Sequence, residues 1–180
     1  MTTTRLVRPN QTWALAYENA FANPATPTTT ELNDGRFVHL ISCALDESGT
    51  ELSLGNSQVD NTVTFCDIGE YKLPTFNKIS AKLTWLTDAN TGGSGSTVDL
   101  TSLYNKTTAL LDYPDQKFWI ISRTGPNASQ DIPFAVGHVI KMALVQTDYP
   151  VWALAVNTPI KKAQTPLYKG QSNWNYSLAA

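Results

Sequence analysis

Hydrophobic and polar residues alternate along two stretches in the middle of the chain, residues 57–66 and 78–88. Because strand side chains point to opposite faces with a period of two, each stretch predicts a β-strand with one apolar and one polar face. The apolar face of the second strand consists of Ile79, Ala81, Leu83 and Trp85. The polar faces consist of Asp60, Thr62, Thr64 and Cys66 in the first strand and of Lys78, Ser80, Lys82 and Thr84 in the second. The role of this polar side is the main question that the pattern raises.

The rest of the chain contains further strand patterns and one helical pattern. Strands are predicted within residues 12–21, 36–42, 116–123, 134–148 and 151–159. The strand at 116–123 is apolar on both faces, as a central strand is, and Gly137 indicates a bulge or close packing in the strand at 134–148. The apolar stripe of a helix over residues 99–112 consists of Leu100, Leu103, Tyr104, Leu110 and Leu111. Asp99 is its expected N-cap, and Pro114 ends it.

The order of strands, one helix and more strands predicts a mainly β fold: a twisted β-sandwich or partial barrel with one flanking helix. Residues 1–35 are predicted to form an N-terminal arm and a first strand, residues 36–159 the β domain, and residues 160–180 a C-terminal arm. Residues 43–58 read as a long polar loop. We expect both arms to be disordered before assembly, because segments rich in threonine and proline bury too little apolar surface.

Composition sets broad limits on the class of protein. A chain of 180 residues with 42% hydrophobic residues is long enough for one folded domain. The net charge of −2 shows no global attraction to nucleic acid or to a membrane surface. Cys43 and Cys66 are expected to be buried, reduced thiols. The first residues lack the apolar core of a secretory signal, and no apolar run approaches the roughly 20 residues of a membrane span, so we expect folding in a cytoplasm.

The search for catalytic or metal-binding residues finds no site. The chain has no phosphate-binding glycine motif, and GGSGS at 92–96 lacks the final glycine of a nucleophile elbow. His39 and Cys43 would lie about 13 Å apart on one strand, which is too far to hold one metal directly. His138 falls on an apolar strand face and reads as a core histidine. We therefore expect no catalytic residue, no metal and no cofactor.

Charge is distributed unevenly along the chain. Residues 46–70 contain six acidic residues and no lysine or arginine, whereas both chain ends are basic. This separation predicts head-to-tail self-association, in which charges set the register of the contact. The acidic residues expected in a ring-stacking loop are Asp46, Glu47 and Glu51. The residues expected to make arm contacts are Arg5, Arg8, Lys161, Lys162, Lys169, Trp174 and Tyr176.

Three stretches of the chain resemble the major tail protein, or tail tube protein, of long-tailed, non-contractile siphophages, particularly those of actinobacteria. They are NTVTFCDIGEYKLPTFNKISAKLTWLTD, VDLTSLYNKTTALLD and the segment from QKFWIISRTGP to QDIPFAVGHVIKMALVQTDYPVWA. The resemblance implies six-membered rings that stack into a hollow tail, each subunit adding a sheet to a continuous inner β-barrel. It also implies that the helix lies outside the barrel, and that loop 43–58 and the arms bridge stacked rings.

The resemblance further implies a virion protein that is assembled in the host cytoplasm and contacts the tape measure, terminator and distal tail proteins. Double-stranded DNA would pass through the tube without specific binding. The polar strand faces would then line the bore, with Asp60, Thr62 and Thr64 as lumen candidates, because a lumen poor in lysine and arginine does not grip phosphates. Lys78 and Lys82 fit this poorly, unless their face looks outward or acids across the strand pair offset them.

Two other functions remain open from the sequence. The first is a head–tail connector or tail terminator, which forms one ring and stops. The second is a β-sandwich module that binds carbohydrate or a host surface and stacks Trp174 and Tyr176 on its ligand. A hydrolase that uses His39 or His138 has the weakest support.

Overall fold

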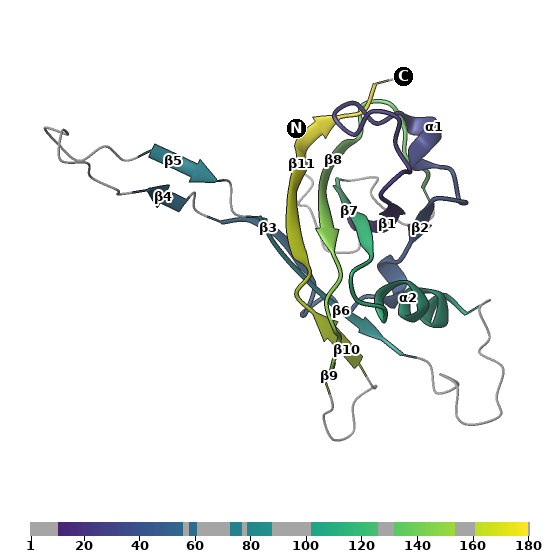
Figure 1. Cartoon of the computed structure of the whole chain (residues 1–180). Helices are drawn as coiled ribbons and strands as arrows, with labels where there is room; N and C mark the ends of the chain where they lie inside the picture. The colour runs from purple at the N-terminus through teal and green to yellow at the C-terminus, as the bar shows by residue number, and fades with distance from the viewer. Residues whose placement is uncertain are drawn as a thin grey trace, which may run out of the picture.

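The computed structural model of the chain describes residues 11–55, 58–60, 73–76, 79–87, 102–125, 132–153 and 161–179. These residues form a five-stranded, a four-stranded and a two-stranded antiparallel sheet, accompanied by two α-helices (Figure 1). The predicted mainly β sandwich with a flanking helix is confirmed. Within the described ranges neither large sheet closes into a barrel.

The five-stranded sheet has the order β11-β8-β7-β1-β2. Its strands are β1 (Gln11–Tyr17), β2 (Val38–Leu40), β7 (Lys117–Thr124), β8 (Val139–Gln146) and β11 (Leu167–Ser177). β7 lies in the middle and has six consecutive buried residues, Phe118 to Arg123. This agrees with the prediction of a strand covered on both faces, because such a strand needs no polar side.

The four-stranded sheet has the order β3-β6-β10-β9. Its strands are β3 (Glu51–Leu54), β6 (Ile79–Leu86), β9 (Val151–Ala153) and β10 (Lys161–Gln164). The predicted apolar face of β6 is confirmed, since Ile79, Ala81, Leu83 and Trp85 are all buried. These side chains pack between the two sheets against apolar residues of the five-stranded sheet, among them Phe118 and Val145, and against Leu111 of α2 (Leu103–Leu111). The inter-sheet core therefore uses one face of each sheet.

The second face of the five-stranded sheet is covered by the segment between β1 and β2. This segment carries α1 (Thr29–Leu32), which begins with a capping box between Thr28 and Glu31. Phe21 and Leu32 cover Trp119 and other residues of the sheet in a second core cluster. The predicted arm 1–35 thus contains an interior strand, β1, and a core-covering segment, while residues 1–10 lie outside the described residues.

A two-stranded hairpin of β4 (Gln58–Asp60) and β5 (Leu73–Phe76) continues the direction of β3 and β6 away from the sandwich (Figure 1). The predicted polar loop 43–58 contains the end of the 3-10 turn η2 (Ser42–Ala44), the whole of β3 and the first residue of β4. The sequence prediction missed β3, whose four residues are too few for a clear alternation, whereas β4 lies within the strand predicted over residues 57–66. β3 follows the turn at 45–50 and is defined by its pairing with β6 rather than by its composition.

The chain's last residues, for which we predicted an arm, form β10 and β11. β10 joins the four-stranded sheet beside β6, and β11 joins the five-stranded sheet beside β8. Lys162 and Gln164 of β10 are buried, although their polarity favoured a solvated arm. Gly137 has φ of +84° and lies in the turn before β8, so it serves a turn rather than a strand bulge.

Candidate self-assembly surfaces

The polar face of the four-stranded sheet looks away from the five-stranded sheet. In the antiparallel pair of β3 and β6, Glu51 lies opposite Lys82 and Ser53 lies opposite Ser80. Directly opposed residues share a face and have Cβ atoms about 5 Å apart, so the Glu51 carboxylate is placed to offset the Lys82 charge. The positive charge of Lys82 did not fit a bore that avoids binding phosphates, and the structure places an acidic residue directly across the strand pair from it. The side chain of Lys78 lies outside the described residues.

The turn at residues 45–50 folds back over this face at Thr84. The Asp46 amide donates to the Thr84 carbonyl at 2.7 Å, and the Thr84 hydroxyl donates to the Gly49 carbonyl at 3.0 Å. A Cβ atom at Gly49 would lie 2.4 Å from the Thr84 Oγ1 atom, so only glycine allows this close packing. Thr84 is consequently buried, and Ser80 and Lys82 remain the exposed polar residues of β6.

Three of the charged residues predicted to act between subunits, namely Asp46, Lys161 and Lys162, are paired inside the chain. Lys161 Nζ lies 2.8 Å from Asp46 Oδ2, and this hydrogen bond is the main reason that the pKa of Asp46 falls below its ordinary value. Lys162 Nζ contacts both carboxylate oxygens of Asp112, and it lies 4.5 Å from the centre of the Trp152 ring. The acidic and basic segments, far apart in sequence, therefore meet within one sandwich. Glu47, Glu51 and Lys169 lie at the surface.

The aromatic residues predicted for arm contacts are also held by the chain itself. Trp174 packs against the inter-sheet core, with Lys141 Nζ 5.2 Å from its ring centre. Tyr176 packs against the other core cluster. Both side chains are only partly exposed, which leaves little free ring surface for stacking on a sugar. Arg5 and Arg8 lie outside the described residues.

The edges of the two sheets differ in how well they could pair with another chain. β11 has two register shifts against β8, and it includes positive φ angles at Gly170 and Asn175. Such bulges twist an edge strand and make it a poor template for pairing. The edges of the four-stranded sheet carry exposed apolar side chains instead: Leu54 on β3, and Val151 and Trp152 on β9. These two edges are the better candidates for contact with another chain.

Residues 1–180 match the family described as "Phage tail tube protein". The chain belongs to this family. A search of curated proteins found no match. Membership indicates a structural component of a phage tail, which assembles with its own copies and with other tail proteins, rather than an enzyme.

Of the lumen residues predicted for this tail tube protein, the structure describes only Asp60. Asp60 ends β4, opposite Leu73 of β5, whereas Thr62 and Thr64 lie outside the described residues. The sequence analysis expected the polar faces of both alternating strands to line the bore, and the polar face of β6, paired with β3, is the part whose side chains the structure describes. Its signal was present in the alternation of residues 79–85, but Lys82 argued against it until the pairing with Glu51 was known.

The two histidines lie in separate places and have structural surroundings. Burial lowers the pKa of His39, with a smaller contribution from the charge of Lys106, and the Tyr17 ring meets the His39 ring edge to face. Burial also lowers the pKa of His138, whose Nδ1 atom accepts from the Ala135 amide at 3.1 Å. Cys43 in the turn η2 is exposed, contrary to the prediction of a buried thiol.

Two further searches cover the described part of the chain. No group of three or more His, Cys, Asp or Glu residues is arranged there to hold a metal ion. No helix there has the length and apolar character needed to cross a membrane.

Proposed function

We propose that this tail tube protein forms rings that stack into a hollow tube for double-stranded DNA, and that the polar face of the four-stranded sheet lines the bore. The observation that carries the proposal is the two-sided character of this sheet. One face is buried against the five-stranded sheet, and the other presents Glu51, Ser53, Ser80 and Lys82. The resemblance to siphophage tail proteins adds six copies per ring, a non-contractile tail of an actinobacteriophage type, and assembly in the host cytoplasm.

The contacts around the ring would join β3 of one copy to β9 of the next. Both are edge strands of the same sheet, and pairing them makes the sheet continuous from copy to copy. A contact between two different edges is heterologous, so it closes into a ring when the rotation per copy is right. Burial of Leu54, Val151 and Trp152 at the joint would add apolar stabilisation to the backbone hydrogen bonds.

The charge of the proposed bore suits a conduit better than a binding site. Glu51 lies opposite Lys82, and Lys161 is paired with Asp46, so the positive side chains near this face have acidic neighbours. DNA affinity rises with the number of phosphates that lysine and arginine neutralise. A face whose lysines have acidic neighbours, and which also carries serine hydroxyls, would therefore let DNA slide without holding it.

Electron microscopy of the purified chain in negative stain tests the assembly. We expect rings and long hollow tubes at raised protein concentration. A single ring that never stacks would favour a terminator or connector, and a monomer at every concentration would contradict the proposal.

A lysine introduced on the proposed bore should create DNA binding. Tubes of Ser80→Lys are expected to co-sediment with short duplex DNA at low salt and to release it as salt rises, because each phosphate contact adds about −0.9 to the slope of log K against log salt. Unmodified tubes should bind much less DNA. Thr30→Lys on α1 is the matched control, since α1 packs on the opposite side of the five-stranded sheet. Equal DNA binding by the two variants would rule out this face as the lumen.

A further inference from the structure

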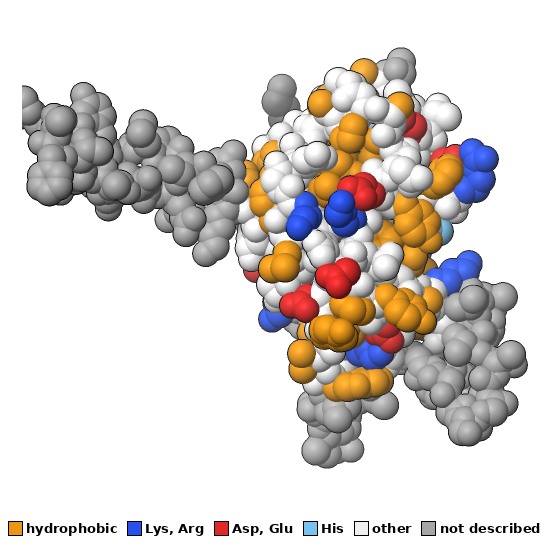
Figure 2. Space-filling view, viewed as in Figure 1, with side chains coloured by type: hydrophobic (Ala, Val, Ile, Leu, Met, Phe, Trp, Pro, Cys, Tyr) orange, Lys and Arg blue, Asp and Glu red, His pale blue; other side chains and the backbone are white. Residues whose placement is uncertain are grey.

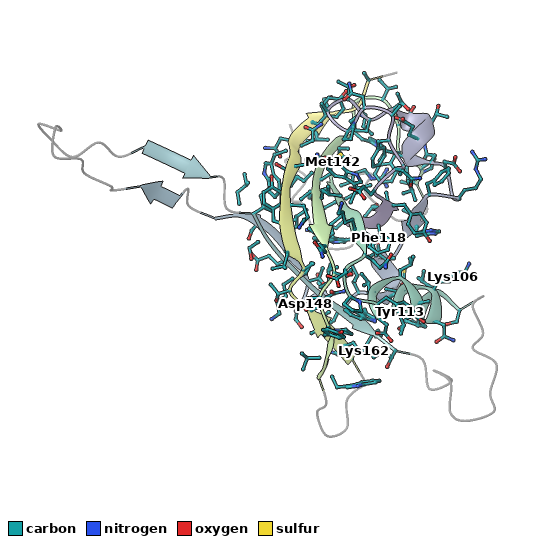
Figure 3. All side chains as sticks on the ribbon, viewed as in Figure 1. Lys106, Tyr113, Phe118, Met142, Asp148 and Lys162 are labelled. Atoms are coloured by element: carbon teal, nitrogen blue, oxygen red, sulfur yellow. The ribbon has the colours of Figure 1, made fainter. Side chains whose placement is uncertain are left out.

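Three exposed apolar side chains cluster where β8 ends. Tyr113, Tyr149 and Leu167 are 66%, 74% and 59% exposed. The Thr147 hydroxyl donates to the Tyr113 carbonyl at 2.7 Å, and Leu167 is the strand partner of Gln146, so all three surround the last residues of β8. We call them the lower patch. Figure 3 labels Tyr113 and Asp148 in this part of the molecule, and Figure 2 shows hydrophobic side chains there with acidic side chains between them.

A second apolar group lies where β8 begins. Ile132, Val136 and Val139 are exposed, and Val136 reaches 61%. We call these residues the upper patch. Residues 132–138 form the turn before β8, and this turn is tied to the chain's C-terminal segment by the hydrogen bond from the Gly137 amide to the Leu178 carbonyl at 2.9 Å. The upper patch therefore lies on the same strand as the lower patch, at the opposite end.

The turn that carries the upper patch is held rigidly. Arg123 is almost fully buried and donates to the carbonyls of Ile132 and Pro133 at 2.7 and 2.9 Å. Asn33 contacts both the amide and the carbonyl of Phe134. A surface fixed in this way loses little conformational entropy when a partner binds, which favours association. The exposure of Val136 is thus a fixed property of the turn.

The placement of the two patches determines what kind of contact they could make. The eight residues of β8 separate them by about 23 Å along the strand. A contact between two different patches is heterologous, and it repeats along a line when successive copies are displaced along an axis without a rotation that closes a ring. The upper patch belongs to the five-stranded sheet and lies apart from the edges β3 and β9, whereas Tyr149 of the lower patch lies two residues before β9.

The pairing of basic residues within the chain also favours an apolar contact between rings over a contact made by ion pairs. Lys161 and Lys162, two of the basic residues predicted for stacking, are paired with acids of their own chain. An aromatic side chain carries roughly 150–250 Å² of surface, so Tyr113, Tyr149 and Leu167 together expose on the order of 300 Å² of mostly apolar area. That area lies at the lower end of the range of about 300–600 Å² for the largest apolar patch on a typical soluble monomer, and such patches are often functional.

We propose that the lower patch of one copy docks on the upper patch of a second copy in the next ring, so that this contact stacks rings into a tube. The inference rests on the proposed tube function and assigns its axial contact to Tyr113, Tyr149 and Leu167 on one side and to Ile132, Val136 and Val139 on the other. Side-chain packing, rather than ion pairing, then supplies the affinity between rings.

Two variants, each altering one patch, test the proposal. The double variant Tyr113→Ser/Tyr149→Ser changes the lower patch, and Val136→Asp changes the upper patch. Each variant is expected to form rings, while the amount of protein in tubes falls about tenfold or more. Tyr104→Ser on α2 is the matched control, because it makes the same change at an exposed tyrosine outside both patches, and it should form normal tubes. Sedimentation velocity and negative-stain microscopy measure ring and tube fractions, and thermal melts check that each variant folds.

Mixing the two variants gives the sharpest readout. Each retains one intact patch, so a mixture should form pairs of rings that neither variant forms alone. Long tubes from either variant, or a mixture that yields only single rings, would overturn the axial contact while leaving the tube function standing. Failure of the unmodified chain to form rings would instead overturn the tube function and this inference together.

Discussion

Replacement of Arg123 by methionine is expected to lower the free energy of unfolding by about 3–5 kcal/mol. The guanidinium donates to the Thr12 hydroxyl at 2.8 Å and to two carbonyl groups of the turn before β8. It also lies 3.0 Å from His138 Nδ1 and 4.8 Å from the centre of the Phe134 ring. Methionine fills similar volume but leaves the buried oxygens without their donor, so the loss exceeds that of a surface change.

Arg36→Met is the matched control for this prediction. It makes the same substitution at an arginine whose side chain is 80% exposed and paired with Asp34, and surface pairs contribute little to stability. Urea unfolding followed by circular dichroism measures both variants, with equal m-values as the sign that only stability has changed. If Arg123→Met and Arg36→Met lower the free energy of unfolding equally, Arg123 does not hold the turn before β8.

Trp85→Ala is expected to cost about 3–5 kcal/mol, because it opens a cavity in the inter-sheet core. Trp85 is 0% exposed and lies on the apolar face of β6 among residues of both sheets and of α2. A smaller side chain there removes contacts that hold the four-stranded sheet on the five-stranded sheet. Tubes should therefore disappear together with the fold, at a temperature where the unmodified chain still assembles.

Two further tryptophan variants separate packing from other effects. Trp152→Ala makes the same change at a ring that is 51% exposed, so the cost to the folded single chain should be much smaller. Trp85→Phe should cost less than Trp85→Ala, because the phenyl ring fills part of the cavity and the buried indole Nε1 has no hydrogen-bond partner among the described residues to lose. Thermal melts compare all three. A Trp85→Phe variant as unstable as Trp85→Ala would show that the indole nitrogen contributes after all.

Parts of the fold and of the candidate site could be predicted because their signal is local. The alternation of Ile79, Ala81, Leu83 and Trp85 predicted a strand with one buried face, and the structure buries all four side chains. The apolar run of β7 predicted a central strand for the same reason. The polar face of β6 was visible as well, although its acidic partner Glu51 could not be assigned without the register.

The sequence by itself determined that this is a mainly β chain with one-sided strands, because strand periodicity depends only on neighbouring residues. Only the tertiary structure decided which charged residues form ion pairs within the chain, as Lys161 does with Asp46, 115 residues away. The same holds for the C-terminal residues that became β10 and β11, and for the two patches at the ends of β8. These features depend on which distant segments pair, and sheet pairing joins segments that no local pattern links.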